Sequence, residues 1–278
     1  MKTLYISDLD GTLLHSDALP SDYTVKTINF LVEKGYNITF ATARSISSAA
    51  EILPNFKLKL PVVMMNGVCL TDINSRKQLN VFGMSREIAG KAIDIFERHG
   101  RPPMHFTVDK NGEICVDYKL IKSKYEQEFM EVRKSRYNHF VQCKEYDVSN
   151  GAIYLSAIDR KETVEAIVEE LKLLDGIGFT YYLDTYSDGQ YFIEVYSSRA
   201  GKQNTINLLK SIYEFDRVVA FGDNGNDVEM LQNADVGIAV GNAQESAKSV
   251  ADLIIDTNEN DGVAKYLMEL YNKGELSH

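Results

Sequence analysis

The amino-acid sequence predicts an α/β protein in which a parallel sheet, built from both ends of the chain, carries an inserted α+β domain. Short apolar segments alternate with helical ones at the start of the 278 residues and again in the last third. The stretch between these two regions has the texture of an antiparallel sheet. A content of 44% hydrophobic and 25% charged residues is ordinary for a globular chain of one large or two modest domains.

The first 65 residues follow the order β-α-β-α-β. Apolar residues recur with helical spacing over 22–34, with Ser21 as a candidate N-cap and Gly35 as the stop signal. The strand-like runs are nearly all apolar, as expected for parallel strands buried on both faces. Strands are predicted over 3–7, 36–41 and 61–65, and a second helix over 45–53.

The last third repeats this rhythm, which places it in the same sheet. Strands are predicted over 217–221, 236–240 and 252–255, and helices over 202–213, 228–232, 243–250 and 262–271. Residues 1–83 and 196–278 are therefore expected to form the core. Residues 84–195 are expected to form the insertion.

The insertion is predicted to be a mostly antiparallel sheet with helices on one face. Aromatic and polar residues alternate over 191–195, and turn signals stand at 111–112 and 187–189. A strand over 152–157 and helices over 85–99 and 161–173 complete the expected elements. No helix or strand is predicted in the segment rich in Lys, Glu and Tyr that lies between the hairpin and the 152–157 strand.

Charge and composition exclude several function classes. A net charge of −10 and a pI near 5.1 argue against nucleic acid and anionic membranes as partners. The sequence contains no leader pattern and no apolar run of about 18 residues, so a cytoplasmic protein is expected. Cys69, Cys115 and Cys143 are scattered, which suits reduced thiols. The oligomeric state is not predicted.

Two acidic motifs follow strands at opposite ends of the chain. Asp8-Leu9-Asp10-Gly11-Thr12 follows the first strand, and 222–227 reads Gly-Asp-Asn-Gly-Asn-Asp after another. Ligands of open parallel sheets bind beyond the carboxyl ends of strands, where Asp8, Thr42, Asn66 and Asp223 are all expected. Clustered carboxylates resist ionising together unless a cation joins them, and hard oxygen ligands suit Mg²⁺.

These motifs, with Thr42 after a strand and Lys202 at a helix start, resemble in order the four motifs of the haloacid-dehalogenase superfamily. The insertion resembles the C2-type cap of its Cof-like branch. The resemblance implies a Rossmann-like core and a Mg²⁺-dependent phosphatase of small phosphorylated metabolites, such as sugar phosphates, that works through an aspartyl-phosphate.

The resemblance also implies a role for each motif residue. Asp8 would be the nucleophile, and Asp10 would protonate the leaving group and then take a proton from water. The transferring phosphoryl would be bound by Thr42, the main chain at Leu9 and Ala43, Lys202 and Asn226, and Arg44 would reach anionic groups of the substrate. Mg²⁺ would be held by Asp8, the Asp10 carbonyl, Asp223 and, directly or through water, Asp227.

Other interpretations stay open at several of these residues. Arg44 could equally be a surface arginine at a helix start, and Asn66-Gly67 is more simply a tight turn than a leaving-group contact. A nucleotide-binding P-loop at Lys202 is excluded, because Gln203 stands where Ser or Thr is needed. Ala43 and Gln203 replace glycines that are common in the superfamily.

The sequence defines the reaction and the substrate less closely than it defines the fold and the site residues. A carboxylate at Asp10 and the lack of membrane spans favour hydrolysis over dehalogenation or transport. A phosphotransferase such as a sugar-phosphate mutase is the alternative enzyme, and a non-catalytic metal-dependent regulatory module is the alternative class. In the cap, His105, Tyr118 and Tyr186 are candidate contacts of the substrate.

Overall fold

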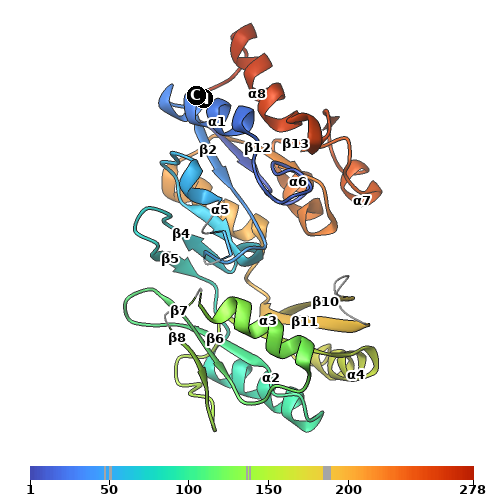
Figure 1. Ribbon diagram of the computed structural model, residues 1–278. Helices are drawn as coiled ribbons and strands as arrows, with labels where there is room; N and C mark the ends of the chain where they lie inside the picture. The colour runs from blue at the N-terminus through green and yellow to red at the C-terminus, as the bar shows by residue number, and fades with distance from the viewer. Residues whose placement is uncertain (47, 50–51, 136, 138, 184–188) are drawn as a thin grey trace. The chain divides into compact units, whose positions relative to one another are not determined.

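The computed structural model describes residues 1–46, 48–49, 52–135, 137, 139–183 and 189–278 (Figure 1). The chain divides into two compact units. One consists of residues 1–80 and 201–278, and the other of residues 81–200. The predicted fold class is confirmed: a parallel sheet forms the core of the first unit, and a separate mixed sheet forms the second.

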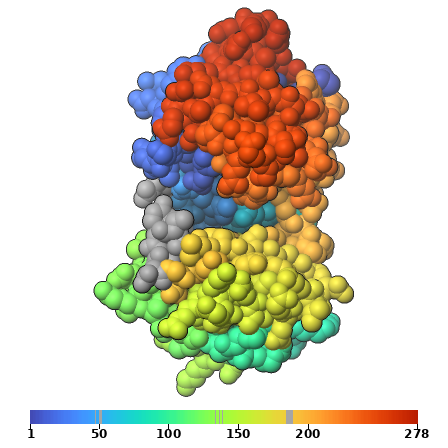
Figure 2. Space-filling model, turned by 90° about the vertical axis from the view of Figure 1, so that its right-hand side faces the viewer, coloured from blue at the N-terminus to red at the C-terminus, as the bar shows by residue number. Residues whose placement is uncertain are grey.

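The first unit is centred on a five-stranded parallel sheet in the order β14-β13-β12-β1-β2. The strand β1 is fully buried, and it pairs on one side with β2 and on the other with the central strand β12, from the far end of the chain. The chain ends therefore share one core, and Figure 2 shows N-terminal residues (blue) beside C-terminal ones (orange and red). The strands are β1 (Thr3–Ser7), β2 (Asn37–Phe40), β12 (Arg217–Gly222), β13 (Val236–Ala239) and β14 (Leu253–Ile254).

Amphipathic helices cover this sheet. The helix α1 begins where the hydroxyl of Ser21 accepts a hydrogen bond from the Thr24 N–H, which confirms the predicted cap. It packs beside α8, and both contribute apolar side chains against Tyr5 and Phe40 of the sheet. The remaining helices include α5 and α6, which contact each other. The bounds are α1 (Asp22–Glu33), α5 (Lys202–Tyr213), α6 (Val228–Asn233), α7 (Glu245–Lys248) and α8 (Gly262–Lys273).

The segment after β2 departs from prediction in two ways. The strand β3 (Val62–Met64) is joined to the parallel sheet by a single bridge, between Ala41 and Val63, and it pairs antiparallel with β4 (Cys69–Thr71) in a sheet completed by β5 (Gln78–Val81). The predicted helix over 45–53 is wrong in its described part, which contains turns and a short 3-10 helix at Leu53–Asn55. Pro54, one residue past the predicted helix, lacks the N–H that would extend a helix beyond Leu53.

The second unit contains a six-stranded sheet in the order β10-β11-β9-β6-β7-β8, antiparallel except for the β7–β8 pair. The hairpin predicted at 111–112 joins β6 to β7. The strands are β6 (Met104–Val108), β7 (Ile114–Tyr118), β8 (His139–Gln142), β9 (Tyr154–Arg160), β10 (Ile177–Leu183) and β11 (Gln190–Ser197). Residues 187 and 188 of the second predicted turn lie outside the described residues.

Helices lie on both faces of this second sheet, so the prediction of helices on one face is wrong. The helices α2 (Arg86–Arg98) and α4 (Lys161–Leu171) share a buried core with Ile193 of β11. The next residue, Phe192, points to the opposite face and contacts Phe129 of α3 (Lys124–Lys134). No element was predicted at α3 because its sequence is strongly polar.

Candidate active site

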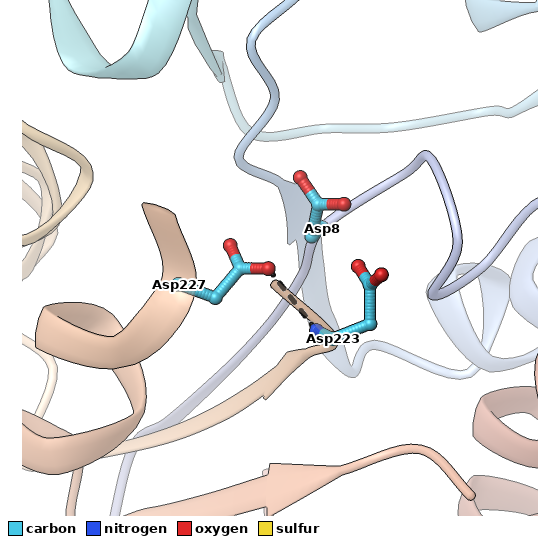
Figure 3. A group of neighbouring side chains, drawn as sticks. All are labelled: Asp8, Asp223 and Asp227. Atoms are coloured by element: carbon cyan, nitrogen blue, oxygen red, sulfur yellow. Dashed lines mark hydrogen bonds between the residues drawn. The ribbon is translucent and has the colours of Figure 1, made fainter. Parts of the chain in front are cut away.

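Carboxylates from both ends of the chain meet where the parallel strands end. Asp8 follows β1, and its N–H continues the ladder by donating to the Phe221 carbonyl of β12 at 2.9 Å. Asp223 follows β12. Figure 3 shows the side chains of Asp8 and Asp223 beside each other, with Asp227 approaching from the helical turn that follows β12. Oxygen atoms of the three carboxylates lie within 4.8 Å of one another.

Lys202 is the positive charge of this cluster. Its Nζ donates to Oδ1 of Asp8 at 2.5 Å and to Oδ1 of Asp227 at 2.6 Å. All three side chains are buried, with exposures of 2%, 7% and 0%. The lysine is the first residue of α5, so the start of this helix fixes where the charge lies.

A glycine contact positions the start of α5. Gly67, with φ +90°, packs so tightly on the chain that a Cβ atom there would lie 2.1 Å from the Gly201 carbonyl oxygen. The Thr205 hydroxyl also donates to the Gly67 carbonyl at 2.6 Å. Any side chain at residue 67 would push α5, and Lys202 with it, away from Asp8.

Both oxygens of Asp227 are engaged by the protein. Oδ1 accepts from Lys202, and Oδ2 accepts at 3.1 Å from the N–H groups of Asp223 and Asn224. With the Asn224 side chain it forms a capping box at the short helical turn. Asp227 therefore shapes the Asp223 loop and holds Lys202.

The turn after Asp8 closes on Asp223. Gly11 has φ +78°, and a Cβ atom there would lie 2.5 Å from Oδ2 of Asp223. The Thr12 hydroxyl donates to Oδ1 of the same carboxylate at 2.8 Å. The contact of Thr12 with Asp223 was not predicted, and the place of Thr12 directly after Asp10 and Gly11 was the available signal.

Asp10 lies apart from the carboxylate cluster, in a two-pronged ion pair with Arg44. Nε of Arg44 donates to one oxygen at 2.8 Å and Nη2 to the other at 2.5 Å. The Asp10 side chain is about half exposed, at 47%. The Arg44 side chain is only 22% exposed, and neither interpretation of Arg44 from the sequence included its pair with Asp10; the contact with a substrate stays a prediction.

The remaining predicted residues line the same strand ends. Thr42 is fully buried, and its hydroxyl accepts from the Arg44 N–H at 3.1 Å. Ala43 does not take a positive φ, so alanine is compatible with the turn here. The side-chain amide of Asn226 donates to Asn66 at 3.0 Å, and Leu9 buries its side chain while its carbonyl accepts from the turn that follows.

Comparison with known proteins decides the family. The model of the haloacid dehalogenase-like hydrolases matches residues 5–267. The chain belongs to this hydrolase family. The predicted superfamily and the predicted enzyme class, a phosphoric monoester hydrolase, are thereby confirmed.

Relatives match over nearly the whole chain at low identity. A 5-amino-6-(5-phospho-D-ribitylamino)uracil phosphatase of Bacillus subtilis is 26% identical, covering 93% of this chain and 91% of its own. A pyridoxal phosphate phosphatase of Escherichia coli is 24% identical, with coverages of 94% and 95%. A crystal structure of a Thermotoga maritima protein shares the fold, with a TM-score of 0.77, 22% identity and 97% coverage of both chains.

The electrostatics of the hydrolase site favour a bound cation. Burial raises the pKa of Asp8 well above its usual range against the opposing effect of Lys202, and burial raises the pKa of Asp223 to about 6. Burial alone would lower the pKa of Lys202, but Asp8 and Asp227 raise it. Three carboxylates face one lysine, so the cluster carries excess negative charge. The donor set is all oxygen and fits a hard divalent cation.

Two of the three cap residues named from the sequence can be located. His105 is fully buried, and its Nε2 lies 2.9 Å from the Gly151 carbonyl, inside the second unit. The candidate substrate contact at His105 is therefore wrong. Tyr118 is partly exposed, with its ring against Phe140. Tyr186 lies outside the described residues.

Among the described residues of the hydrolase, every helix is too short or too polar to cross a lipid bilayer.

Proposed function

We propose that this hydrolase is a Mg²⁺-dependent phosphatase that removes phosphate from small phosphorylated metabolites through an aspartyl-phosphate on Asp8. The observation that carries the proposal is the buried Asp8 carboxylate, held at the end of β1 by Lys202 and facing Asp223. A positioned carboxylate beside fixed positive charge is suited to attack phosphorus, because repulsion by the phosphate is reduced.

In the first step, an oxygen of Asp8 forms a bond to phosphorus while the bond to the leaving oxygen breaks. Lys202 binds Oδ1, so we assign the attack to Oδ2. A proton from Asp10 goes to the leaving oxygen, which departs as an alcohol. In the second step, water attacks phosphorus, Asp10 takes its proton, and the bond from phosphorus to Asp8 breaks to release inorganic phosphate.

Asp10 must leave Arg44 to perform this role. The two-pronged pair engages both oxygens of Asp10 with Arg44 donors, whereas the first step needs Asp10 to donate a proton to the leaving oxygen. We propose that anionic groups of the substrate draw Arg44 away, which frees Asp10 and binds the substrate at once. This gives Arg44 the substrate-binding role expected from the sequence.

The phosphoryl group would be bound by groups that meet at the strand ends. Lys202 supplies charge, Thr42 and Asn226 supply polar side chains, and the main-chain N–H groups near Leu9 and Ala43 complete the set. Such a preorganised site stabilises charge that spreads over the phosphoryl oxygens in the transition state.

The Mg²⁺ ligands would be the carboxylates of Asp8 and Asp223 and the main-chain carbonyl of Asp10. Bound there, the cation would neutralise and orient the phosphate. Both oxygens of Asp227 are occupied by hydrogen bonds, which supports an indirect role for Asp227 in holding Asp223 and Lys202.

We further propose that the inserted residues, expected at 84–195, act as the cap that selects the leaving group. The phosphatases of B. subtilis and E. coli named above act on phosphorylated organic metabolites, a uracil derivative and pyridoxal phosphate. A similarly small phosphomonoester is therefore the proposed substrate class.

A panel of phosphorylated sugars, nucleotides and vitamins tests the proposal. Release of inorganic phosphate is measured with Mg²⁺ and with a chelator, for the wild type and for Asp8→Asn. Asp22→Asn, at a fully exposed helix position, is the matched control. The proposal predicts Mg²⁺-dependent release by the wild type and the control alone. Transfer of the phosphoryl group back to a sugar without release would favour the mutase, and no turnover of any ester would overturn the proposal.

A further inference from the structure

Two asparagines outside the motifs hold the turn that follows the nucleophile. The Asn242 side chain, in the loop after β13, donates from Nδ2 to the Gly11 carbonyl at 2.7 Å. The Asn258 side chain donates from Nδ2 to the Leu14 carbonyl at 2.8 Å. The two asparagines are themselves joined, since Oδ1 of Asn242 accepts from the Asn258 N–H at 2.9 Å.

These three hydrogen bonds link Gly11, Asn242, Asn258 and Leu14, and the chain from Gly11 to Leu14 closes the ring. Within that turn, the N–H groups of Thr12, Leu13 and Leu14 all point to the Leu9 carbonyl, at 2.9–3.3 Å. The carbonyls of Gly11 and Leu14 point out of the turn, and each receives one asparagine side chain. Both outward carbonyls are therefore fixed from the C-terminal part of the chain.

The same loop also holds the second acidic motif. Two residues after Asn242, the Gln244 N–H donates to the Asp223 carbonyl at 2.8 Å. Residues 242–244 thus bind the Gly11 carbonyl on one side and the Asp223 carbonyl on the other. The Thr12 to Asp223 hydrogen bond spans the same two loops, so their separation is set by two independent links.

We infer that Asn242 and Asn258 are positioning residues that hold the Asp8–Thr12 turn in register with the Asp223 loop for catalysis. This inference rests on the proposed function for its kinetic part. The exposure of Asn242 supports a local role, because an exposed side chain contributes little to the hydrophobic core. Asn258 is buried, at 6% exposure, so its side chain cannot exchange the Leu14 carbonyl for water without opening the loop.

Asparagine-to-aspartate variants remove the side-chain donor of each asparagine one at a time. Asn242→Asp keeps the acceptor for the Asn258 N–H but replaces the donor to Gly11 with an oxygen that repels the carbonyl. Asn258→Asp likewise replaces the donor to the Leu14 carbonyl with an oxygen that repels it, and it keeps the main-chain N–H that binds Asn242. Asn260→Asp is the matched control, since Asn260 lies in the same short 3-10 turn (Asn258–Asn260) and its side chain bonds Asp256 instead.

Steady-state kinetics on an artificial phosphomonoester, hydrogen exchange of the 9–15 segment and the thermal midpoint are measured for the wild type, these three variants and Asn242→Ser. We expect kcat to fall about 10- to 100-fold in Asn242→Asp and Asn258→Asp, with KM changed less than about threefold. Exchange should speed up at 9–15, while Asn260→Asp matches the wild type. Asn242→Ser, which removes the repelling charge, should recover part of kcat.

Unchanged kcat and unchanged exchange in both aspartate variants would overturn the inference while leaving the phosphatase intact. The inference would also be overturned if kcat fell only in parallel with the thermal midpoint and Asn242→Ser recovered none of the lost kcat. The asparagines would then act through the folding of the whole protein. If the wild type turns over no phosphomonoester, the proposed function fails, and the exchange data alone then decide whether the asparagines hold the turn.

Discussion

Nζ of Lys202 lies 2.5 Å from Oδ1 of Asp8, although 194 residues separate them in the chain. The contact is buried, and Asp227 completes it from the other side. Removing one partner of a buried ion pair strongly destabilises a protein, because the other charge is left buried and unpaired. This contact therefore links the stability of the fold to the chemistry of the site.

Replacing Lys202 with Met should cost about 3 kcal/mol or more in the metal-free protein, because it leaves Asp8 and Asp227 buried without their cation. Urea unfolding in the presence of a chelator measures the change. Lys210→Met, on the same helix but in a partly exposed pair with Asp235, should stay within about 1 kcal/mol of wild type. A Lys202→Met protein as stable as wild type would contradict the assigned pair.

Replacing Asp10 with Asn should lower kcat by roughly 10²- to 10⁴-fold on alkyl phosphates, because the leaving oxygen then lacks its proton donor. The loss should be smaller on an aryl phosphate, whose leaving group departs without protonation. Kinetics with the two ester types measure the difference. Equal losses on both would argue that Asp10 acts by a route other than proton transfer.

Replacing Arg44 with Ala should raise KM with little effect on stability. The Asp10 partner is half exposed, so the pair should contribute no more than about 1 kcal/mol to unfolding. Arg44→Lys should recover only part of the lost affinity, since lysine keeps the charge but not the two-pronged geometry. An unchanged KM in Arg44→Ala would rule out the substrate-binding role.

Mg²⁺ should raise the thermal midpoint more at about pH 8 than at about pH 5. In the metal-free fold the pKa of Asp223 is raised from 3.8 to about 6 by burial. Its protonation therefore favours the folded state fully below about pH 4, and this contribution is lost as the pH rises through about 6. Mg²⁺ competes with that proton, so its effect grows as the proton leaves. An equal shift at both pH values would contradict this linkage.

The sequence predicted the position of the main carboxylates because strand ends are local features. Asp8 and Asp223 each follow an apolar run, and parallel strands bring such ends to one edge of a sheet. The contact of Lys202 with Asp8 could be expected only from the family resemblance, since a lysine at a helix start carries no such signal alone. Its contact with Asp227 was not predicted.

Other contacts depend on how separate loops approach each other, which periodicity does not encode. The Arg44–Asp10 pair and the two asparagine contacts to the 9–14 turn are of this kind. Some short or polar helices and strands were not predicted, for a different reason. The strand β4 has three residues, and α3 has too few apolar positions for a clear helical period.

The formation of an aspartyl-phosphate on Asp8 is the central claim, and trapping the intermediate tests it most directly. The Mg²⁺-loaded wild type is quenched with acid during turnover, treated with borohydride, which reduces an acyl phosphate to homoserine, and mapped by peptide mass spectrometry. We predict homoserine at residue 8 in the wild type and at no other aspartate, with none in Asp8→Asn. Turnover without any trapped residue, or homoserine at another aspartate, would contradict the proposed mechanism.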